Sequence, residues 1–228
     1  MHRKKAIVFI DGLAQKDLAE YGITPRQILE EIVKIYKNNG LEFNYVFTGL
    51  PVKSWSHKSG VAADFHTAKH LLQVVFREAE NEFLNLGSRK YKHDVFIFLS
   101  GCLFIGYGKA KYSPYFPGNG LILLGTRKPS EKFTNSIFKL FRKPFWEHKL
   151  DCLVECLRLN FRPLVNDFNY YNLDYLERLA LVGTHEQGHL YDLDHVNDIN
   201  SIMYKYSNSA GRVFDSVSKF KIQSGIFS

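Results

Sequence analysis

Blocks of apolar residues alternate with polar stretches through the first half of the chain, and they predict strands separated by helices. Residues 6–10 form a continuous apolar run that ends at Asp11-Gly12, a pattern typical of a buried strand. Thr24-Pro25 predicts the start of a helix, whose apolar face continues at helical spacing until Asn38-Asn39-Gly40 stops it. The pattern predicts three more strands, at residues 41–47, 95–99 and 121–124. It also predicts one more helix, at residues 64–83.

Helical spacing dominates the chain after residue 145. One helix is predicted over residues 147–159 and another over residues 172–190, with Asn172 as its cap. Strands that alternate with helices, followed by helices alone, predict an α/β (α+β) fold with a twisted sheet in the N-terminal half. A length of 228 residues suffices for a sizeable core and fits one domain or two closely packed subdomains.

The composition is typical of a folded protein without a membrane-spanning segment. Hydrophobic residues make up 45% of the chain and aromatic residues 15%, and no stretch approaches the roughly 18 apolar residues of a membrane span. The apolar run near the N-terminus is too short for a signal peptide. An odd number of cysteines, 3, is unusual in secreted proteins. These features predict a cytoplasmic protein.

The net charge of +7 admits nucleic acid or an anionic surface as a partner. The basic residues are nevertheless spread along the chain, with only short clusters at Arg3-Lys4-Lys5 and Arg142-Lys143. A solvated basic surface is therefore favoured over a nucleic-acid-binding one. The oligomeric state is not indicated by any pattern in the chain.

The candidate chemistry lies in one segment near the C-terminus, His185-Glu186-Gln187-Gly188-His189-Leu190-Tyr191-Asp192-Leu193-Asp194-His195. On a helix, a spacing of four residues puts His185 and His189 on the same face, where both imidazoles can bind one metal ion. Glu186 then lies beside the metal and can take a proton from metal-bound water. His195 reaches the same ion only if the helix ends and the chain turns back. Three histidines and a fourth position for water indicate a catalytic zinc site, because structural zinc sites are normally closed by four protein ligands.

The spacing of these histidines resembles the metzincin signature H-E-x-x-H-x-x-G-x-x-H. Met203, in Ser201-Ile202-Met203-Tyr204, resembles the Met-turn that underlies the zinc in that clan. Within the clan the chain is similar to the archaemetzincins, and the likeness extends from Leu176-Glu177-Arg178 to Tyr206-Ser207-Asn208-Ser209. Upstream, residues 104–110 and 120–127 are similar to the glycine turn and edge strand of that family.

The resemblance implies one metallopeptidase domain over residues 1–228. Residues 1–190 would form an N-terminal subdomain that ends in the active-site helix, and residues 191–228 a small C-terminal subdomain with the Met-turn. An antiparallel edge strand, for which residues 121–124 are the candidate, would line the cleft where a peptide or protein substrate adds as a further strand. Zinc would activate a water molecule for attack on the peptide bond, with Glu186 as the general base.

Two departures from the family pattern change these expectations. Asp192 stands where the family has Gly at the sharp turn toward the third ligand. Asp tolerates a left-handed backbone better than most residues, so the turn remains feasible at a cost of about 1 kcal/mol. The cysteines that bind a second, structural zinc in the family are also missing, and Val196 and Ser201 occupy two of their positions. We therefore expect one zinc per chain.

Two alternatives remain open from the sequence. The chain could be another zincin, such as a SprT-like protease that acts on DNA-bound proteins, with a third ligand from elsewhere. The register of His195 with Met203 speaks against that reading. It could instead be a catalytically inactive zinc-binding or scaffold module. Retention of Glu186 speaks against an inactive module, because a binding protein has no need of the base.

Other pairs of metal-ligating residues fit structural roles better. His66 and His70 lack a neighbouring Glu and a third ligand, so they are predicted to be polar residues of an amphipathic helix. His148, Cys152 and Cys156 extend over about 12 Å of helix and cannot all bind one ion. Gly106-Tyr107-Gly108 lacks the further residues of a nucleotide-binding loop.

Overall fold

A six-stranded twisted sheet forms the centre of the computed structural model, which describes residues 2–46, 53–62, 65–86, 94–113, 116–128, 174–198, 200–204 and 211–227. The strand order is β2-β1-β4-β6-β5, with β3 beside β1. All pairings are parallel except that of β5 with β6. The predicted α/β class with a mainly parallel sheet is therefore confirmed. The strands are β1 (His2–Ile10), β2 (Phe43–Val46), β3 (Lys53–Ser54), β4 (Asp94–Phe104), β5 (Gly108–Ser113) and β6 (Phe116–Arg127).

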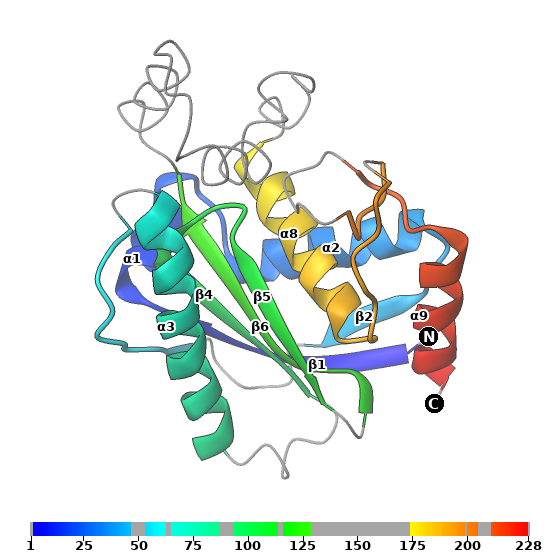
Figure 1. The fold of residues 1–228 in the computed structure, drawn as a ribbon, viewed down its shortest axis with the longest axis horizontal. Helices are drawn as coiled ribbons and strands as arrows, with labels where there is room; N and C mark the ends of the chain where they lie inside the picture. Colours follow the sequence, from blue (N-terminus) through cyan, green and yellow to red (C-terminus); the bar gives the residue numbers. More distant parts are fainter. Residues whose placement is uncertain are drawn as a thin grey trace, which may run out of the picture.

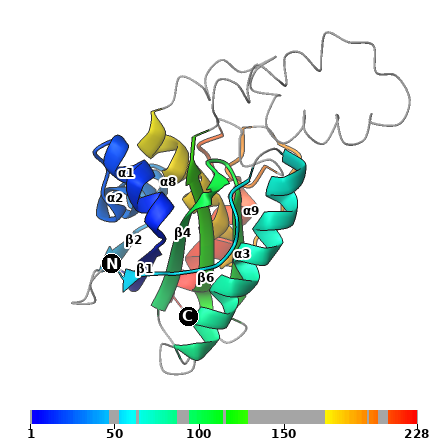
Figure 2. The same ribbon diagram turned by 90° about the vertical axis from the view of Figure 1, so that its left-hand side faces the viewer.

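Helices cover both faces of the sheet (Figures 1 and 2). On one face lie α1 (Gly12–Glu20), α2 (Pro25–Asn38) and α8 (Tyr175–His189), whose buried side chains form one apolar core with the strands. The other face is covered by α3 (Phe65–Asn85), which packs in a second core. The C-terminal helix α9 (Ser216–Phe227) contributes Ile222 to the first core. Among the helices in the described ranges, none is both long enough and apolar enough to cross a membrane.

The predicted helix after Thr24 matches α2. Thr24 and Gln27 form a capping box, and Pro25 occupies the first turn, where its missing N–H costs nothing. The predicted apolar face is buried, with Ile28, Ile32 and Tyr36 each at most 1% exposed. The chain leaves the helix at Asn39, as the Asn-Asn-Gly signal indicated.

Helix α8, predicted over residues 172–190, begins later than predicted. Its cap is Asp174, whose carboxylate accepts a 2.7 Å hydrogen bond from the backbone N–H of Glu177. Asn172, the predicted cap, lies outside the described residues, as do the predicted helix 147–159, Phe47 and the Ser207-Asn208-Ser209 segment. Both Asn and Asp are good caps, so the sequence alone did not choose between the two positions.

The prediction that residues 121–124 form the edge strand is wrong. These residues lie in β6, between β4 on one side and β5 on the other, and all four are fully buried. The edge is β5, where residues 109–112 are partly or wholly exposed. A continuous apolar run is typical of an interior strand covered on both faces, whereas an edge strand tolerates charged side chains such as Lys109 and Lys111.

Candidate metal centre

The three predicted ligands, His185, His189 and His195, lie together at the carboxyl end of α8. The Nε2 atoms of His185 and His189 are 3.1 Å apart. The Nε2 atom of His195 is 3.3 Å from that of His185 and 3.2 Å from that of His189. His185 is buried, His189 is half-buried and His195 is exposed, so the point where the three nitrogens meet is open to solvent on one side.

Backbone carbonyl groups fix the orientation of two of these rings. The Nδ1 atom of His185 is 2.7 Å from the carbonyl oxygen of Ile202, and that of His189 is 2.7 Å from the carbonyl oxygen of Leu193. A carbonyl oxygen only accepts, so each Nδ1 carries the proton and each Nε2 presents a lone pair. This is the arrangement by which proteins orient metal-binding histidines.

The spacing of the nitrogens fits a tetrahedral zinc ion. Bonds of about 2.0–2.1 Å in tetrahedral geometry put ligand nitrogens about 3.3–3.4 Å apart. Burial lowers the pKa of His185 to about 3, with a further contribution from neighbouring His189, and burial also lowers the pKa of His189. Both imidazoles are therefore neutral near pH 7, which is the form that binds a metal.

The turn after α8 brings His195 back toward the helix. The N–H of Leu193 donates to the carbonyl of Gly188 at 3.4 Å, and the N–H of Asp192 to that of His189 at 3.1 Å. These are the two bonds of a Schellman ending, which needs a left-handed residue. Asp192 takes that conformation, with φ of 57°. Asp192 therefore makes the left-handed turn that the sequence predicted to be feasible for Asp at this position.

We expect Asp192→Gly to stabilise the protein by up to about 1 kcal/mol, because Gly adopts a left-handed backbone without strain. Urea unfolding measures the effect. Asp194→Gly is the matched control, since Asp194 has no positive φ, and there the added chain entropy of Gly should lower stability. A fall in stability for Asp192→Gly would show that its side chain is needed at the turn.

Met203 packs against α8 at Gly188, the residue before His189. It is fully buried, and a Cβ on Gly188 would come within 2.4 Å of its sulfur, so Gly188 allows the side chain to pack against the helix. A turn from Ser201 to Tyr204, closed by a 3.1 Å hydrogen bond, holds Met203 in place. The residue before Met203, Ile202, supplies the carbonyl that orients His185. One turn thus packs Met203 against α8 and orients the His185 ring.

The carboxylate of Glu186 lies beside the first residue of β5. A Cβ on Gly108 would come within 2.6 Å of Glu186 Oε1 and 2.7 Å of its Cγ, so any side chain at position 108 would displace the Glu186 carboxylate. Glu186 is 4% exposed. Burial raises the pKa of Glu186 to about 8, against the opposing effect of the Lys109 ammonium. A carboxyl group with a pKa near neutrality is suited to accept and return a proton.

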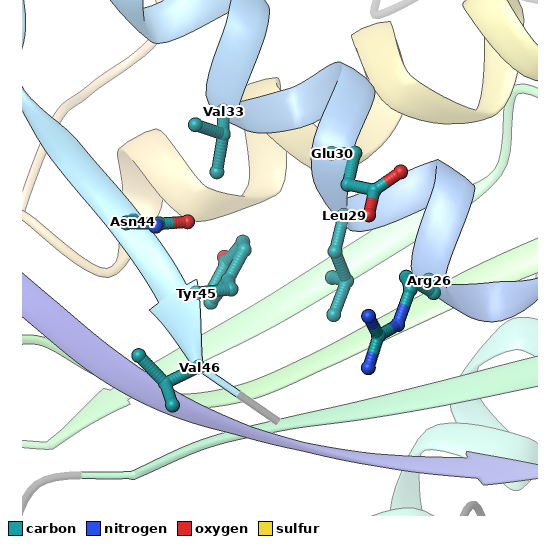
Figure 3. A pocket seen from close by; sticks show the side chains of 7 residues that line it. All are labelled: Arg26, Leu29, Glu30, Val33, Asn44, Tyr45 and Val46. Atoms are coloured by element: carbon teal, nitrogen blue, oxygen red, sulfur yellow. The ribbon is translucent and has the colours of Figure 1, made fainter. Parts of the chain in front are cut away.

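Gln187 anchors α8 to two other parts of the chain through contacts that the sequence did not predict. The side-chain amide of Gln187 donates to the carbonyl of Gly118 at 3.2 Å, and its carbonyl accepts from the hydroxyl of Tyr45. Tyr45 also lines a pocket of about 470 Å³ between α2 and β2, which contains no residue of the histidine site (Figure 3). The only sequence signal for these contacts was the polar Gln187 between the two histidines. The sequence could not reveal its partners, because Tyr45 and Gly118 are far away along the chain.

The other residues singled out in the sequence have different placements. His70 is exposed on α3, as predicted for a polar residue of an amphipathic helix. Gly106-Tyr107-Gly108 leads from β4 into β5. His148, Cys152 and Cys156 lie outside the described residues. A second group of metal-ligating side chains, Asp11, His57 and Cys102, occurs in the described part of the chain and was not predicted.

No protein-family model matches the chain, and neither does any curated protein. Solved structures with low similarity include a zinc-dependent peptidase from Methanocorpusculum labreanum, with 13% identity and a TM-score of 0.44 over 95% of this chain and 99% of that chain. Archaemetzincin from Methanopyrus kandleri has 15% identity and a TM-score of 0.46, over 100% of this chain and 97% of that one. Metalloproteinase-II from Bacteroides fragilis has 12% identity and a TM-score of 0.47, over 100% of this chain and 54% of that one.

Proposed function

We propose that the protein is a zinc-dependent peptidase of the metzincin type, similar to the archaemetzincins. The observation that carries the proposal is the convergence of three Nε2 atoms within 3.3 Å of one another, on a helix in which the buried Glu186 directly follows the first ligand. The Nε2 lone pairs of neutral imidazoles point toward a common position. A cation can bind at that position. Among the residues that the structure describes, we propose that His185, His189 and His195 bind one zinc ion.

Each residue has a separate role in the proposed hydrolysis. A bound zinc would lower the pKa of its water and polarise the scissile carbonyl. Glu186 accepts the proton of the attacking water and gives it to the leaving amine. Ile202 and Leu193 hold two of the imidazoles through their carbonyl groups, and Met203 supports the ligands from below.

The proposed substrate is an extended peptide or a segment of a protein. Strand β5 ends the strand order, and its first residue lies against Glu186. A peptide that added along β5 as a further strand would pass close to the histidine site, and its backbone would supply the hydrogen bonds. We also propose that the chain is one catalytic domain, divided near residue 190 into an N-terminal and a C-terminal subdomain.

The two alternatives are less well supported. A zincin with a third ligand from elsewhere has no need of a histidine at position 195, yet the His195 Nε2 atom lies 3.2 Å and 3.3 Å from the other two. A binding module has no need of a buried carboxyl group whose pKa is raised to about 8.

Cleavage of a peptide library by the zinc-loaded protein tests the proposal, with new amino termini identified by mass spectrometry. We expect cleavage at defined sites that stops when zinc is removed by a chelator. A zinc-loaded, folded protein that cleaves no peptide in the library would contradict the proposal and favour the binding module.

Gly108 provides a second test, because it touches the general base and no zinc ligand in the contacts described. In Gly108→Ala the new methyl group would overlap the Glu186 carboxylate, so we expect kcat/KM to fall by at least about 10-fold while zinc content is kept. Gly12→Ala is the matched control, since nothing lies within 4 Å of its Cβ position. Equal activity of the two variants would contradict the proposed position of Glu186.

A further inference from the structure

Asp11, His57 and Cys102 bring a carboxylate, an imidazole and a thiol together at a second place in the fold. Their ligand atoms all lie within 4.8 Å of one another. The His57 Nε2 atom is 2.7 Å from Asp11 Oδ2 and 3.9 Å from Cys102 Sγ. Ser100 Oγ is 3.4 Å from the same nitrogen. Two oxygen atoms and one sulfur atom thus lie around the His57 Nε2 atom.

The Asp11 carboxylate is held in place by backbone groups. Its Oδ1 accepts hydrogen bonds from the N–H groups of Leu13, Ala14 and Gly101, at 3.0, 2.7 and 3.2 Å. The other oxygen, Oδ2, faces His57. Oδ1 therefore caps α1, and Oδ2 can bind an ion. Asp11 can bind an ion in this way without giving up its role at the start of α1.

The far side of the His57 ring faces a second carboxylate. Glu78 Oε2 on α3 lies 3.5 Å from His57 Nδ1, and Ser59 Oγ donates a 2.7 Å hydrogen bond to Glu78 Oε2. A zinc-binding histidine usually donates its second N–H to a carboxylate; His57 Nδ1 makes no hydrogen bond within the described part of the chain, and Glu78 is the carboxylate near enough to accept one after a small shift. The His57 side chain is only 4% exposed. Two carboxylates around one buried imidazole give the site a strong preference for positive charge.

The topology of the sheet places this cluster where α/β folds bind ligands. From β1 the chain passes through α1 and α2 on one face to β2, and β3 also pairs with β1. It then passes through α3 on the opposite face to β4, on the other side of β1. The β1–β4 junction is therefore the topological switch point, and ligands bind beyond the carboxyl ends of strands at such a point.

The end of β4 is also irregular at this place. The register with β6 shifts between Ser100 and Phe104, and Cys102 lies within the shift. Bulges of this kind often redirect a side chain near a functional site. Cys102 is buried against the core that includes α3, whereas His185 and His189 extend from α8, which belongs to the core on the other face. The cluster is thus separate from the histidine site.

We propose that Asp11, His57 and Cys102 bind a second zinc ion at the switch point between β1 and β4, in addition to the one zinc per chain expected from the sequence. Carboxylate, neutral imidazole and thiolate are all zinc ligands, and the thiolate favours zinc over magnesium or calcium. The ion would replace the direct hydrogen bond between His57 and Asp11, so the ring must move back by about half an ångström to reach zinc–ligand distances. His57 lies in an irregular stretch after β3, where such a movement disturbs no strand pairing. The Cys102 proton leaves to solvent on binding, as does any proton on His57 Nε2.

Cobalt(II) titration of metal-free protein tests this proposal, because cobalt occupies zinc sites and a bound thiolate adds an intense charge-transfer band. The three ligands proposed for the histidine site are imidazoles and include no thiolate, so a thiolate band distinguishes the second site from it. We expect two equivalents of cobalt and the band in the wild type. Cys102→Ser should remove the band and one equivalent, and His57→Gln should weaken or remove both.

Matched variants separate this site from the rest of the chain. Cys152→Ser combined with Cys156→Ser should keep the band, and circular dichroism of each variant checks that it is folded. His189→Ala should lose the equivalent at the histidine site and keep the band, so the second site can stand even if the proposed peptidase site fails. Absence of the band in the wild type, or its survival in Cys102→Ser, would overturn the proposal and leave His57 and Asp11 as an ion pair.

Discussion

Glu186→Gln is expected to abolish most of the peptidase activity while the protein keeps its zinc. Gln has the shape of Glu but cannot take a proton, so the substitution removes the general base without opening a cavity. The contribution of a positioned general base is typically about 100- to 10,000-fold, and we expect kcat/KM to fall within that range. Peptide cleavage and zinc content are measured on the same preparation.

The control for this variant is Glu31→Gln. Glu31 lies on α2 and pairs with Lys34 on the same helix at 2.9 Å. An exposed ion pair contributes little to stability, so this variant should keep wild-type activity. Full activity of zinc-loaded Glu186→Gln would rule out Glu186 as the base and with it the proposed mechanism.

His195→Ala is expected to weaken zinc binding at the histidine site by more than about 100-fold. Loss of a residue that only supports a ligand typically costs about 10- to 100-fold in affinity, so loss of a ligand itself should cost more. Competition with a chelator of known zinc affinity measures the change. Because His195 is exposed, its removal should leave the core and the fold intact.

His70→Ala serves as the matched control, since His70 is an exposed histidine on α3. It should bind zinc as the wild type does. If His195→Ala bound zinc at the histidine site as tightly as the control, the third ligand would come from elsewhere, as in the alternative zincin.

The parts of the site that the sequence predicted are local ones. His185 and His189 are one helical turn apart, so any helix at that place brings them together. The return of His195 depends on a turn at Asp192, which a residue tolerant of the left-handed region can make. Met203 follows within a few residues. Spacing along a helix and one turn were enough, because no distant part of the chain decides these positions.

The parts that the sequence did not predict depend on residues far apart in the chain. Gly108 contacts Glu186 only because β5 folds back beside β6. His57 and Asp11 are separated by 46 positions, and no spacing rule relates them. The edge strand was misplaced for a related reason: an apolar run shows that a strand is buried, but the order of strands decides which one lies at the edge.

The most direct test of the central claim is whether zinc at the histidine site restores peptide cleavage. Protein freed of metal by a chelator is titrated with zinc while cleavage of a peptide and zinc binding are followed together, in the wild type and in His195→Ala. We predict that the wild type is inactive without metal, that its activity rises as the histidine site fills, and that His195→Ala shows no recovery at the same free zinc. Equal recovery in both proteins, or cleavage by the wild type that does not depend on zinc, would contradict the assignment of His185, His189 and His195 as the catalytic zinc ligands.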